Sequence, residues 1–209
     1  MVKEGVTTFA KAFDVLAHGL QTHQNIRMGS FWEFLRDVWS QGFDHPEYFK
    51  AWHIGVLADD IEKALEEGKN YVAVLPRFHF KSTILGHAFS IWQILRATRD
   101  CAVLYLSYSD GMAKYHISEI NKTIARNPEL KEMFISKNPK ADFSFRYHVN
   151  NKPVEIMHGG LFSFKRGMHV NGALIADDVL RDPENPLNPA QLTNCLLYTS
   201  DAADDLLCV

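Results

Sequence analysis

The chain contains 209 residues, of which 46% are hydrophobic and 22% are charged, with 22 basic and 25 acidic side chains. This length and balance predict one α/β domain with a sizeable core. They argue against a protein that binds nucleic acid through a generally basic surface, and they leave open a local basic surface that contacts DNA. No segment approaches the length of a membrane span, and the first residues lack the layout of a signal peptide. We therefore expect a cytosolic protein with no membrane partner.

Three helices are expected in the first third of the chain. Apolar residues at helical spacing mark the first helix at 8–20. Ser30 followed by Glu33 has the spacing of a capping box and begins the second helix. The third helix covers 44–68. We assign residues 1–68 to a helical N-terminal segment of the domain that follows.

The stretch YVAVLPRFHFKST has the order strand, loop, helix. Residues 71–75 are of strand type, Pro76 breaks the run, and Lys81 and Ser82 stand before an apolar segment with helical spacing at 84–97. A phosphate-binding loop needs this order, because amides of the loop and of the first helical turn converge on an anion. Lys81 would then reach the β and γ phosphates of a nucleotide, and the Ser82 hydroxyl would bind Mg²⁺.

The usual glycines of such a loop are absent. In the pattern G-x-x-x-x-G-K-[ST], the two glycine positions fall on Leu75 and Phe80. Glycine is common there because the backbone approaches phosphate closely, often at positive φ, where a phenylalanine has a steric cost. A buried strand followed by an ordinary helix that begins at Lys81 is therefore an equal alternative for this stretch alone.

The middle of the chain continues the alternation of strands and helices. Residues 101–107 are predicted to form a buried strand, and Ser109 is predicted to cap the helix that follows. Residues 155–157 and 161–164 look like two short strands paired across a hairpin turn at 158–160. None of the ten histidines forms a pair with the spacing of a helical metal site, so we interpret them as structural or exposed.

A second motif, GALIADD at 172–178, ends in two adjacent carboxylates. It reads as a buried parallel strand that delivers Asp177 and Asp178 to the carboxyl edge of a sheet, where the loop after Leu75 also lies. In a nucleotide hydrolase the first acid holds magnesium through water and the second polarises the attacking water. Adjacent aspartates also occur in turns and helix caps, but the two motifs together favour a nucleoside triphosphatase.

This ordered set of motifs resembles the large subunit of tailed-phage terminase, the motor that packages DNA. The family's nucleotide loop often has the form Pro-Arg-x-x-x-Lys-Ser/Thr, which corresponds here to Pro76, Arg77, Phe78, His79, Phe80, Lys81, Ser82 and Thr83. LYLSYS at 104–109 and Arg166-Gly167-x-His169 are similar to the family as well, and the resemblance spans roughly 31–188. The chain departs from the family at Phe78 and Phe80, where small residues are usual, and at Asp178, where many members have Glu.

The resemblance implies a three-layer P-loop NTPase-like α/β fold with a mostly parallel sheet, and an incomplete ATPase core at 69–194. It implies ATP and Mg²⁺ as cofactors, with nucleotide bound by residues 76–83 and the metal held by Ser82 and Asp177. Lys81 and Arg77 would stabilise charge on the γ-phosphoryl group, and Asp178 would orient the attacking water.

Partners and further contacts also follow from the resemblance. It implies double-stranded DNA, the portal of a procapsid, the small terminase subunit and further copies in a ring as partners, in the cytoplasm of a phage host. Tyr48 or Trp52 would stack on adenine, with a plain core position as the alternative for either ring. Lys165 and Arg166 would touch DNA or a neighbouring subunit's nucleotide, with a solvated basic pair as an equal alternative. A nuclease domain is expected only in the full-length protein.

The segment 195–209, CLLYTSDAADDLLCV, resembles the translation of a transposase-based sequencing adapter, so we expect it not to be native. It holds three aspartates and no basic residue, so the remainder of the chain has 22 acidic and 22 basic side chains and is neutral. Without Cys195 and Cys208 the chain keeps Cys101, which cannot form a disulfide within the chain and fits a reducing compartment.

Two other functions remain open from the sequence. A helicase-like or recombination ATPase would use the same loop and the same acids. A domain that binds nucleotide or a partner without hydrolysis would fit the phenylalanine-substituted loop.

Overall fold

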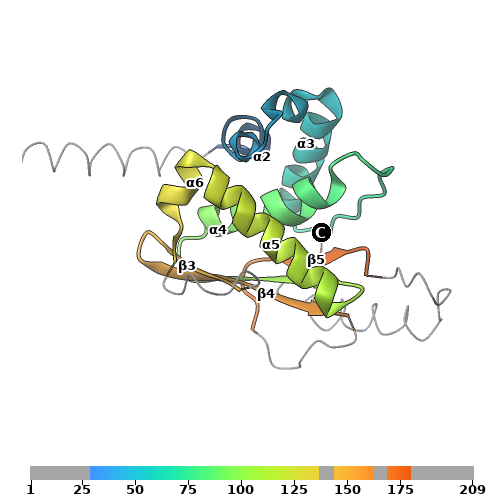
Figure 1. Cartoon of the computed structure of the whole chain (residues 1–209). Coiled ribbons are helices and arrows are strands. Elements are labelled where there is room, and N and C mark those ends of the chain that lie inside the picture. The colour runs from blue at the N-terminus through green and yellow to red at the C-terminus, as the bar shows by residue number, and fades with distance from the viewer. Residues whose placement is uncertain (1–28, 137–143, 162–168, 180–209) are drawn as a thin grey trace, which may run out of the picture.

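The structure, a computed structural model, describes residues 29–136, 144–161 and 169–179. Within these ranges the chain forms one mixed α/β arrangement, with helices packed on one side of a twisted open sheet (Figure 1). The helix expected at 8–20, the basic pair Lys165 and Arg166, and the segment 195–209 lie outside the described residues. The predicted α/β class is confirmed, whereas the assignment to the P-loop class stays a prediction.

The sheet has the strand order β2-β3-β4-β1-β5. β1 pairs in parallel with β4 on one side and with β5 on the other, while β3 runs antiparallel to β4 and β2 antiparallel to β3. The parallel half carries the acidic motif at its edge. The strands are β1 (Cys101–Ser107), β2 (Ile135–Ser136), β3 (Phe145–Val149), β4 (Lys152–Gly160) and β5 (Leu174–Asp177).

The hairpin predicted across 158–160 is wrong, because β4 runs through these residues without a turn and pairs with β1 as far as Gly160. The hairpin turn lies instead at Asn150 and Asn151, which join β3 to β4 with φ of 50° and 62°, as a tight two-residue turn requires. Gly160 serves a packing role, since a Cβ there would lie 2.7 Å from the amide nitrogen of Asp110.

The strand predicted at 71–75 does not join the described sheet. Its residues alternate between partly buried and exposed, and Tyr71, Ala73 and Leu75 pack against the core while Val72 and Val74 are exposed. Such alternation fixes which side faces the core, but a strand also needs a neighbour for its backbone groups. None of the described strands pairs with this segment, so the prediction of a sheet strand is wrong here.

The helical N-terminal part begins at the predicted capping box. The amide of Glu33 donates to Ser30 Oγ at 3.1 Å, and the amide of Ser30 donates to Glu33 Oε2 at 3.0 Å. The helix expected over 44–68 forms in two pieces, because Ala51 between them is extended. Denoting 3₁₀ and π segments by η, these elements are α2 (Phe31–Glu33), η1 (Phe34–Val38), η2 (Trp39–Gly42), η3 (Pro46–Lys50) and α3 (Trp52–Glu66).

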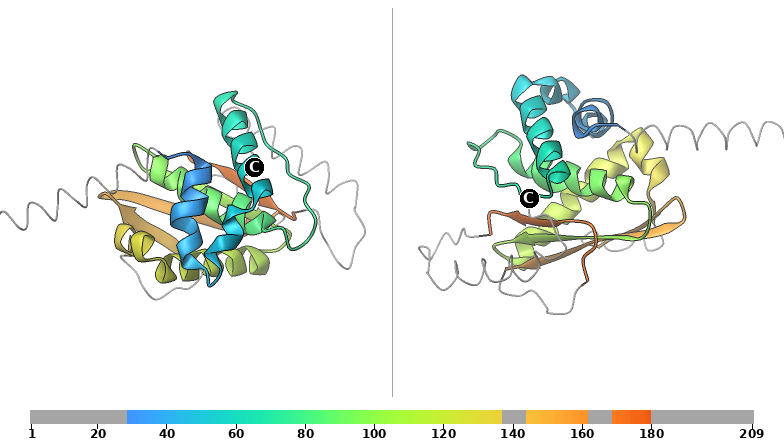
Figure 2. Two further views of the ribbon diagram at one scale, coloured as in Figure 1. Left: turned by 90° about the horizontal axis from the view of Figure 1, so that it is seen from above. Right: turned by 180° about the vertical axis from the view of Figure 1, so that it is seen from behind.

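The remaining helices match the sequence pattern closely. The helix after the candidate loop comprises η4 (Ser82–Ala88) and α4 (Phe89–Arg96), and α5 (Asp110–Arg126) starts at the predicted Ser109 cap before the short α6 (Pro128–Met133). Figure 2 shows from two further directions that α4 and α5 lie on the sheet and that α2 and α3 lie over them. No helix of the described residues is long and apolar enough to cross a membrane.

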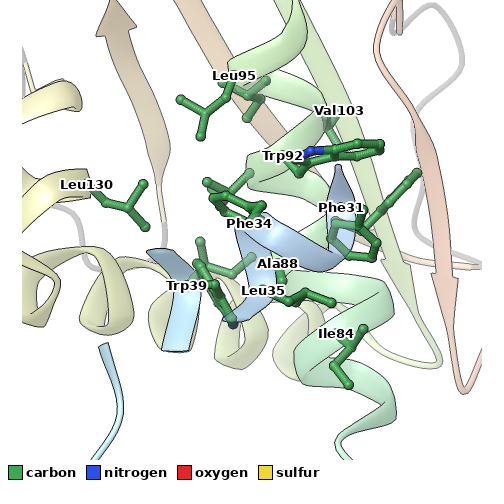
Figure 3. Packing of buried hydrophobic residues seen from close by; sticks show 14 of the residues in the cluster. Phe31, Phe34, Leu35, Trp39, Ile84, Ala88, Trp92, Leu95, Val103 and Leu130 are labelled. Atoms are coloured by element: carbon green, nitrogen blue, oxygen red, sulfur yellow. The ribbon is translucent and has the colours of Figure 1, made fainter. Parts of the chain in front are cut away.

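An aromatic core packs the N-terminal helices against the helix that follows the candidate loop, η4 and α4, which we call the loop helix. The ring of Phe31 lies 4.9 Å from the ring of Trp92 and 5.7 Å from that of Phe89, so α2 packs directly on α4 (Figure 3). Ile84 and Ala88 of η4 are fully buried in the same cluster. Burying side chains of this size supplies about 1.5–3 kcal/mol each, which holds the start of the loop helix in a fixed place on the sheet.

Candidate functional site

The two predicted motifs meet at the carboxyl edge of the parallel strands. Lys81, at the start of η4, has its Nζ 2.6 Å from Asp178 Oδ1 and 3.8 Å from Asp177 Oδ1. Asp177 is the last residue of β5 and its side chain is 8% exposed, whereas the side chains of Lys81 and Asp178 are 27% and 48% exposed. The structure therefore brings together one cation and two acids that the sequence proposed for one site.

The loop before Lys81 has glycine-like backbone geometry without glycine. Phe78 and Phe80 have φ of 67° and 56°, in the left-handed region that favours glycine. The ring of Phe80 lies 5.5 Å from that of the buried Phe49 and 6.5 Å from that of Tyr48, while Phe78 is 97% exposed. Packing of Phe80 on η3 thus stabilises the conformation that glycine would adopt without strain.

The other predicted loop residues surround the first turn of the helix. The amide of Ile84 donates to the Phe80 carbonyl at 2.8 Å, so the amides just before Ile84 precede the first bond of this helix. Ser82 and Thr83 are partly buried, and Pro76 and His79 are exposed, with His79 Nδ1 2.9 Å from the Arg77 carbonyl oxygen.

Arg77 is exposed at the outer end of the loop. An exposed guanidinium can serve in a surface ion pair instead of in catalysis. In the part of the chain that the structure describes, no acid forms an ion pair with Arg77. Its side chain is therefore available to an anion bound at the loop.

A buried polar network holds Asp177, and sequence reasoning missed it. The Tyr105 hydroxyl donates to Asp177 Oδ2 at 2.9 Å, and His116 Nε2 lies 3.6 Å from the same oxygen. His87 Nε2 in turn lies 2.9 Å from His116 Nδ1. The sequence offers only a weak signal for this network, in polar groups at buried positions of a strand and of two amphipathic helices.

Burial shifts the pKa values of the two histidines and of the tyrosine in this network. It lowers the pKa of His87 to about 3, with a further contribution from the neighbouring His116. It also lowers the pKa of His116, against the opposing attraction of Asp177 and Asp178. The pKa of the Tyr105 hydroxyl is raised well above its usual value by burial and by the charge of Asp177. These shifts favour the neutral form of both histidines and the protonated form of the tyrosine.

A glycine makes room at this edge, and a buried serine lies beside Asp177. A Cβ on Gly86 would lie 2.6 Å from the Tyr105 hydroxyl oxygen, so a glycine in η4 lets the tyrosine of β1 reach Asp177. Ser107, which pairs with Asp177 in the register of β1 and β5, is buried, and its hydroxyl has no hydrogen-bond partner among the described residues.

Exposed aromatic rings stand beside the loop. Tyr48, an expected adenine-stacking residue, is half exposed, and its ring stacks on that of His45 with centroids 5.0 Å apart. Trp52 is exposed at the start of α3, and the ring of its neighbour His53 lies 5.8 Å from that of His79. Contact with adenine stays a prediction for both aromatic residues.

The available ligands suit a magnesium ion that arrives with a nucleotide. Within the described ranges, no group of three or more His, Cys, Asp or Glu residues could hold a metal by itself. Mg²⁺ in a nucleotide site takes most of its ligands from phosphate and water, so one hydroxyl and one carboxylate are sufficient. Ser82 and Asp177 offer hard oxygen atoms of this kind, and among the described residues Tyr105 and His116 contact Oδ2 of Asp177 while its Oδ1 faces Lys81.

Comparison with known proteins adds no family assignment. No protein-family model and no curated protein matches this chain. The functional interpretation therefore depends on the geometry of the loop and the two acids, and on the resemblance of the motifs that carry them.

Proposed function

We propose that this chain is the ATP-hydrolysing part of a phage terminase large subunit, which drives double-stranded DNA into a procapsid. The observation that carries the proposal is the convergence of Lys81 with Asp177 and Asp178, two acids that end a strand 97 residues away at the carboxyl edge of a parallel sheet. In α/β sheets this edge is where ligands bind.

Binding of the triphosphate would be the task of the loop and of the first helical turn. The amides that precede Ile84 and the positive end of the helix dipole favour a phosphate group at this place. Lys81 would exchange its ion pair with Asp178 for phosphate oxygens, since an ammonium group forms stronger charge-assisted bonds with a polyanion. Arg77, free of described acids, would approach the γ-phosphoryl group and stabilise the charge that develops there.

Hydrolysis would proceed by in-line attack of water at the γ-phosphorus. Release of Asp178 from Lys81 would leave its carboxylate free to orient this water. Magnesium bound with the nucleotide would neutralise charge on the phosphates, with Ser82 and Asp177 as its protein-side oxygens. The partners implied by the resemblance, namely DNA, portal, small subunit and a ring of copies in the host cytoplasm, belong to this proposal.

Binding without hydrolysis is a second candidate, because two observations favour it. Lys81 and Asp178 already satisfy each other in a direct ion pair, and Phe78 and Phe80 occupy strained backbone conformations in the loop. A helicase-like or recombination ATPase would share the same site geometry. Hydrolysis of Mg·ATP would separate either enzyme from the binding protein, and stimulation by procapsids would separate the terminase from the other ATPases.

The Lys81→Ala variant tests the proposal most directly. Loss of the cation aimed at the phosphates should abolish Mg·ATP binding, measured by isothermal titration calorimetry. Lys122→Ala is the matched control, because Lys122 is an exposed lysine that pairs with Glu119 on α5 and should be dispensable. Undiminished affinity in Lys81→Ala, with normal folding, would show that the loop does not bind phosphate.

A further inference from the structure

The two oxygens of the Asp177 carboxylate have different surroundings. Oδ2 accepts a hydrogen bond from the Tyr105 hydroxyl at 2.9 Å and faces His116 Nε2 at 3.6 Å. Oδ1 faces the loop instead, with Lys81 Nζ at 3.8 Å. One oxygen is therefore held from the protein interior and the other is directed toward the candidate nucleotide site.

The contact between the two histidines fixes the direction of the donors. His87 Nε2 and His116 Nδ1 lie 2.9 Å apart, a hydrogen-bond distance at which one of these nitrogens carries a hydrogen and the other accepts it. A proton on His116 Nδ1 would leave the lone pair of its Nε2 facing the carboxylate, which is repulsive. A proton on His116 Nε2 is attracted to Asp177, so His87 must donate to His116 and His116 must point its hydrogen at Oδ2.

We propose that His116, oriented by His87, acts with Tyr105 as a positioning residue that holds Asp177 Oδ2 and leaves Oδ1 as the oxygen available to a nucleotide-bound magnesium ion. This inference rests on the proposed function of the site. Asp177 would then offer one oxygen to the metal or its water, because Oδ2 accepts from the Tyr105 hydroxyl and faces His116. Polar groups that orient a metal ligand in this way control its affinity for the metal.

The fold supports a positioning role for this network. Tyr105 comes from β1, His87 from η4 and His116 from α5, and all three residues are at least nine-tenths buried. Their contacts join η4, α5 and β1 to the carboxylate at the end of β5. The network can therefore hold the end of β5 at a constant place relative to the start of the loop helix.

Removal of each donor should weaken metal binding while sparing the fold. We would measure the affinity of Mn²⁺ for the ATP-bound protein by electron paramagnetic resonance, with Tyr105→Phe and His116→Phe as test variants. Each should lose about 10-fold or more in Mn²⁺ affinity, the usual effect of removing a group that orients a metal ligand. ATP affinity without metal should not change, because Lys81 and the loop are intact.

Two further variants separate positioning from simple loss of stability. Tyr147→Phe removes a hydroxyl from another tyrosine of the sheet, which donates to Asn121 at 3.1 Å and is remote from Asp177, so it should have wild-type Mn²⁺ affinity. His116→Gln keeps a side-chain N–H that can reach Asp177 and should recover much of the affinity lost in His116→Phe. An equal loss in Tyr147→Phe, or no recovery in His116→Gln, would contradict positioning.

Nitrogen-15 NMR of the histidine rings tests the donor direction without nucleotide or metal. The proposal requires the proton of His116 on Nε2 and that of His87 on Nε2; a proton on His116 Nδ1 would overturn it. The two proposals can also fail separately. Wild-type protein that binds neither ATP nor Mn²⁺ would overturn both, whereas normal wild-type binding with unchanged Mn²⁺ affinity in Tyr105→Phe and His116→Phe would overturn only this inference.

Discussion

Lys81 and Asp178 form an ion pair of 2.6 Å between Nζ and Oδ1 although 97 residues separate them in the sequence. Both side chains are partly exposed, so the pair contributes little stability and can open at low cost. In the proposed site this ion pair would compete with the nucleotide. It occupies the ammonium group that would bind phosphate and the carboxylate that would orient water.

Substitution of the two acids by asparagine should have different effects on nucleotide binding and on hydrolysis. Asp178→Asn should leave Mg·ATP binding nearly intact, because Lys81 is released rather than lost, and should lower the rate of hydrolysis about 100-fold or more, as loss of a general base does. Asp177→Asn should weaken magnesium-dependent binding instead. Calorimetry and a phosphate-release assay on the two variants distinguish the roles, and equal losses of binding in both would contradict them.

Phe78 and Phe80 both have a positive φ but differ in packing, so replacement by glycine should have opposite effects on stability. Phe78→Gly relieves the strain of a positive φ and loses no ring contact, so the free energy of unfolding should rise by up to about 1 kcal/mol. Phe80→Gly also relieves strain but removes the ring packed on Phe49, a loss that should exceed the gain by about 1 kcal/mol or more.

Urea unfolding of both variants measures this difference. Because each variant is the control for the other, effects of the glycine substitution itself on the unfolded chain cancel in the comparison. If Phe80→Gly proved as stable as Phe78→Gly, the ring of Phe80 would not be the anchor of the loop.

Acid should destabilise the domain through His87. The pKa of this buried ring is about 3 when folded, against an ordinary value of 6.5. Because the pKa of His87 is lower in the folded state, the unfolded state binds a proton more readily. The contribution of neutral His87 to the free energy of unfolding is therefore fully present above pH 6.5 and is lost as the pH falls toward 3. The slope approaches about 1.4 kcal/mol per pH unit for one such histidine. His87→Phe should flatten the profile measured by urea unfolding between pH 6.5 and 4, and an unchanged slope would contradict the assignment.

Local signals predicted the elements that carry the site. The Ser30 and Ser109 caps, the helix after Lys81 and the strand that ends at Asp177 all follow from short-range patterns of capping and apolar periodicity. The sequence also predicted that the two acids lie at the carboxyl edge of the sheet, since parallel strands place their carboxyl ends together.

Features that depend on strand register could not be predicted. The contact of Tyr105 with Asp177 requires β1 to lie beside β5 with Leu104 opposite Leu174, and nothing in either strand specifies that pairing. The glycines at 159 and 160 suggested a turn from local propensity, but helix packing accounts for Gly160. The run at 71–75 shows the same limit, because its periodicity predicts a buried side and says nothing about a partner strand.

The segment 195–209 should be dispensable for stability. A translated adapter was never selected to bury its leucines against this domain, so its deletion should change the free energy of unfolding by less than about 0.5 kcal/mol. Thermal and urea unfolding of the chain ending at Asn194 measure the effect. A deletion that unfolded the domain, or source DNA whose codons differ from those of the adapter, would show that the segment is native.

Gly86 should be intolerant of any side chain because of Tyr105. A Cβ at this position would lie 2.6 Å from the hydroxyl oxygen and 2.9 Å from Cε2 of the tyrosine, so Gly86→Ala must displace either η4 or the ring. Overpacking of this kind costs about 1–3 kcal/mol, and the displaced hydroxyl would leave Asp177 Oδ2.

A double-mutant cycle isolates this contact. Tyr105→Phe removes the nearest atom but leaves the ring carbon close, so it should restore part of the stability lost in Gly86→Ala. The two substitutions should therefore be non-additive in urea unfolding, with a coupling of about 0.5 kcal/mol or more between residues in contact. Strict additivity would mean that η4 moves away from β1 as a unit, and that the loop helix is less firmly fixed to the sheet than its buried aromatic core implies.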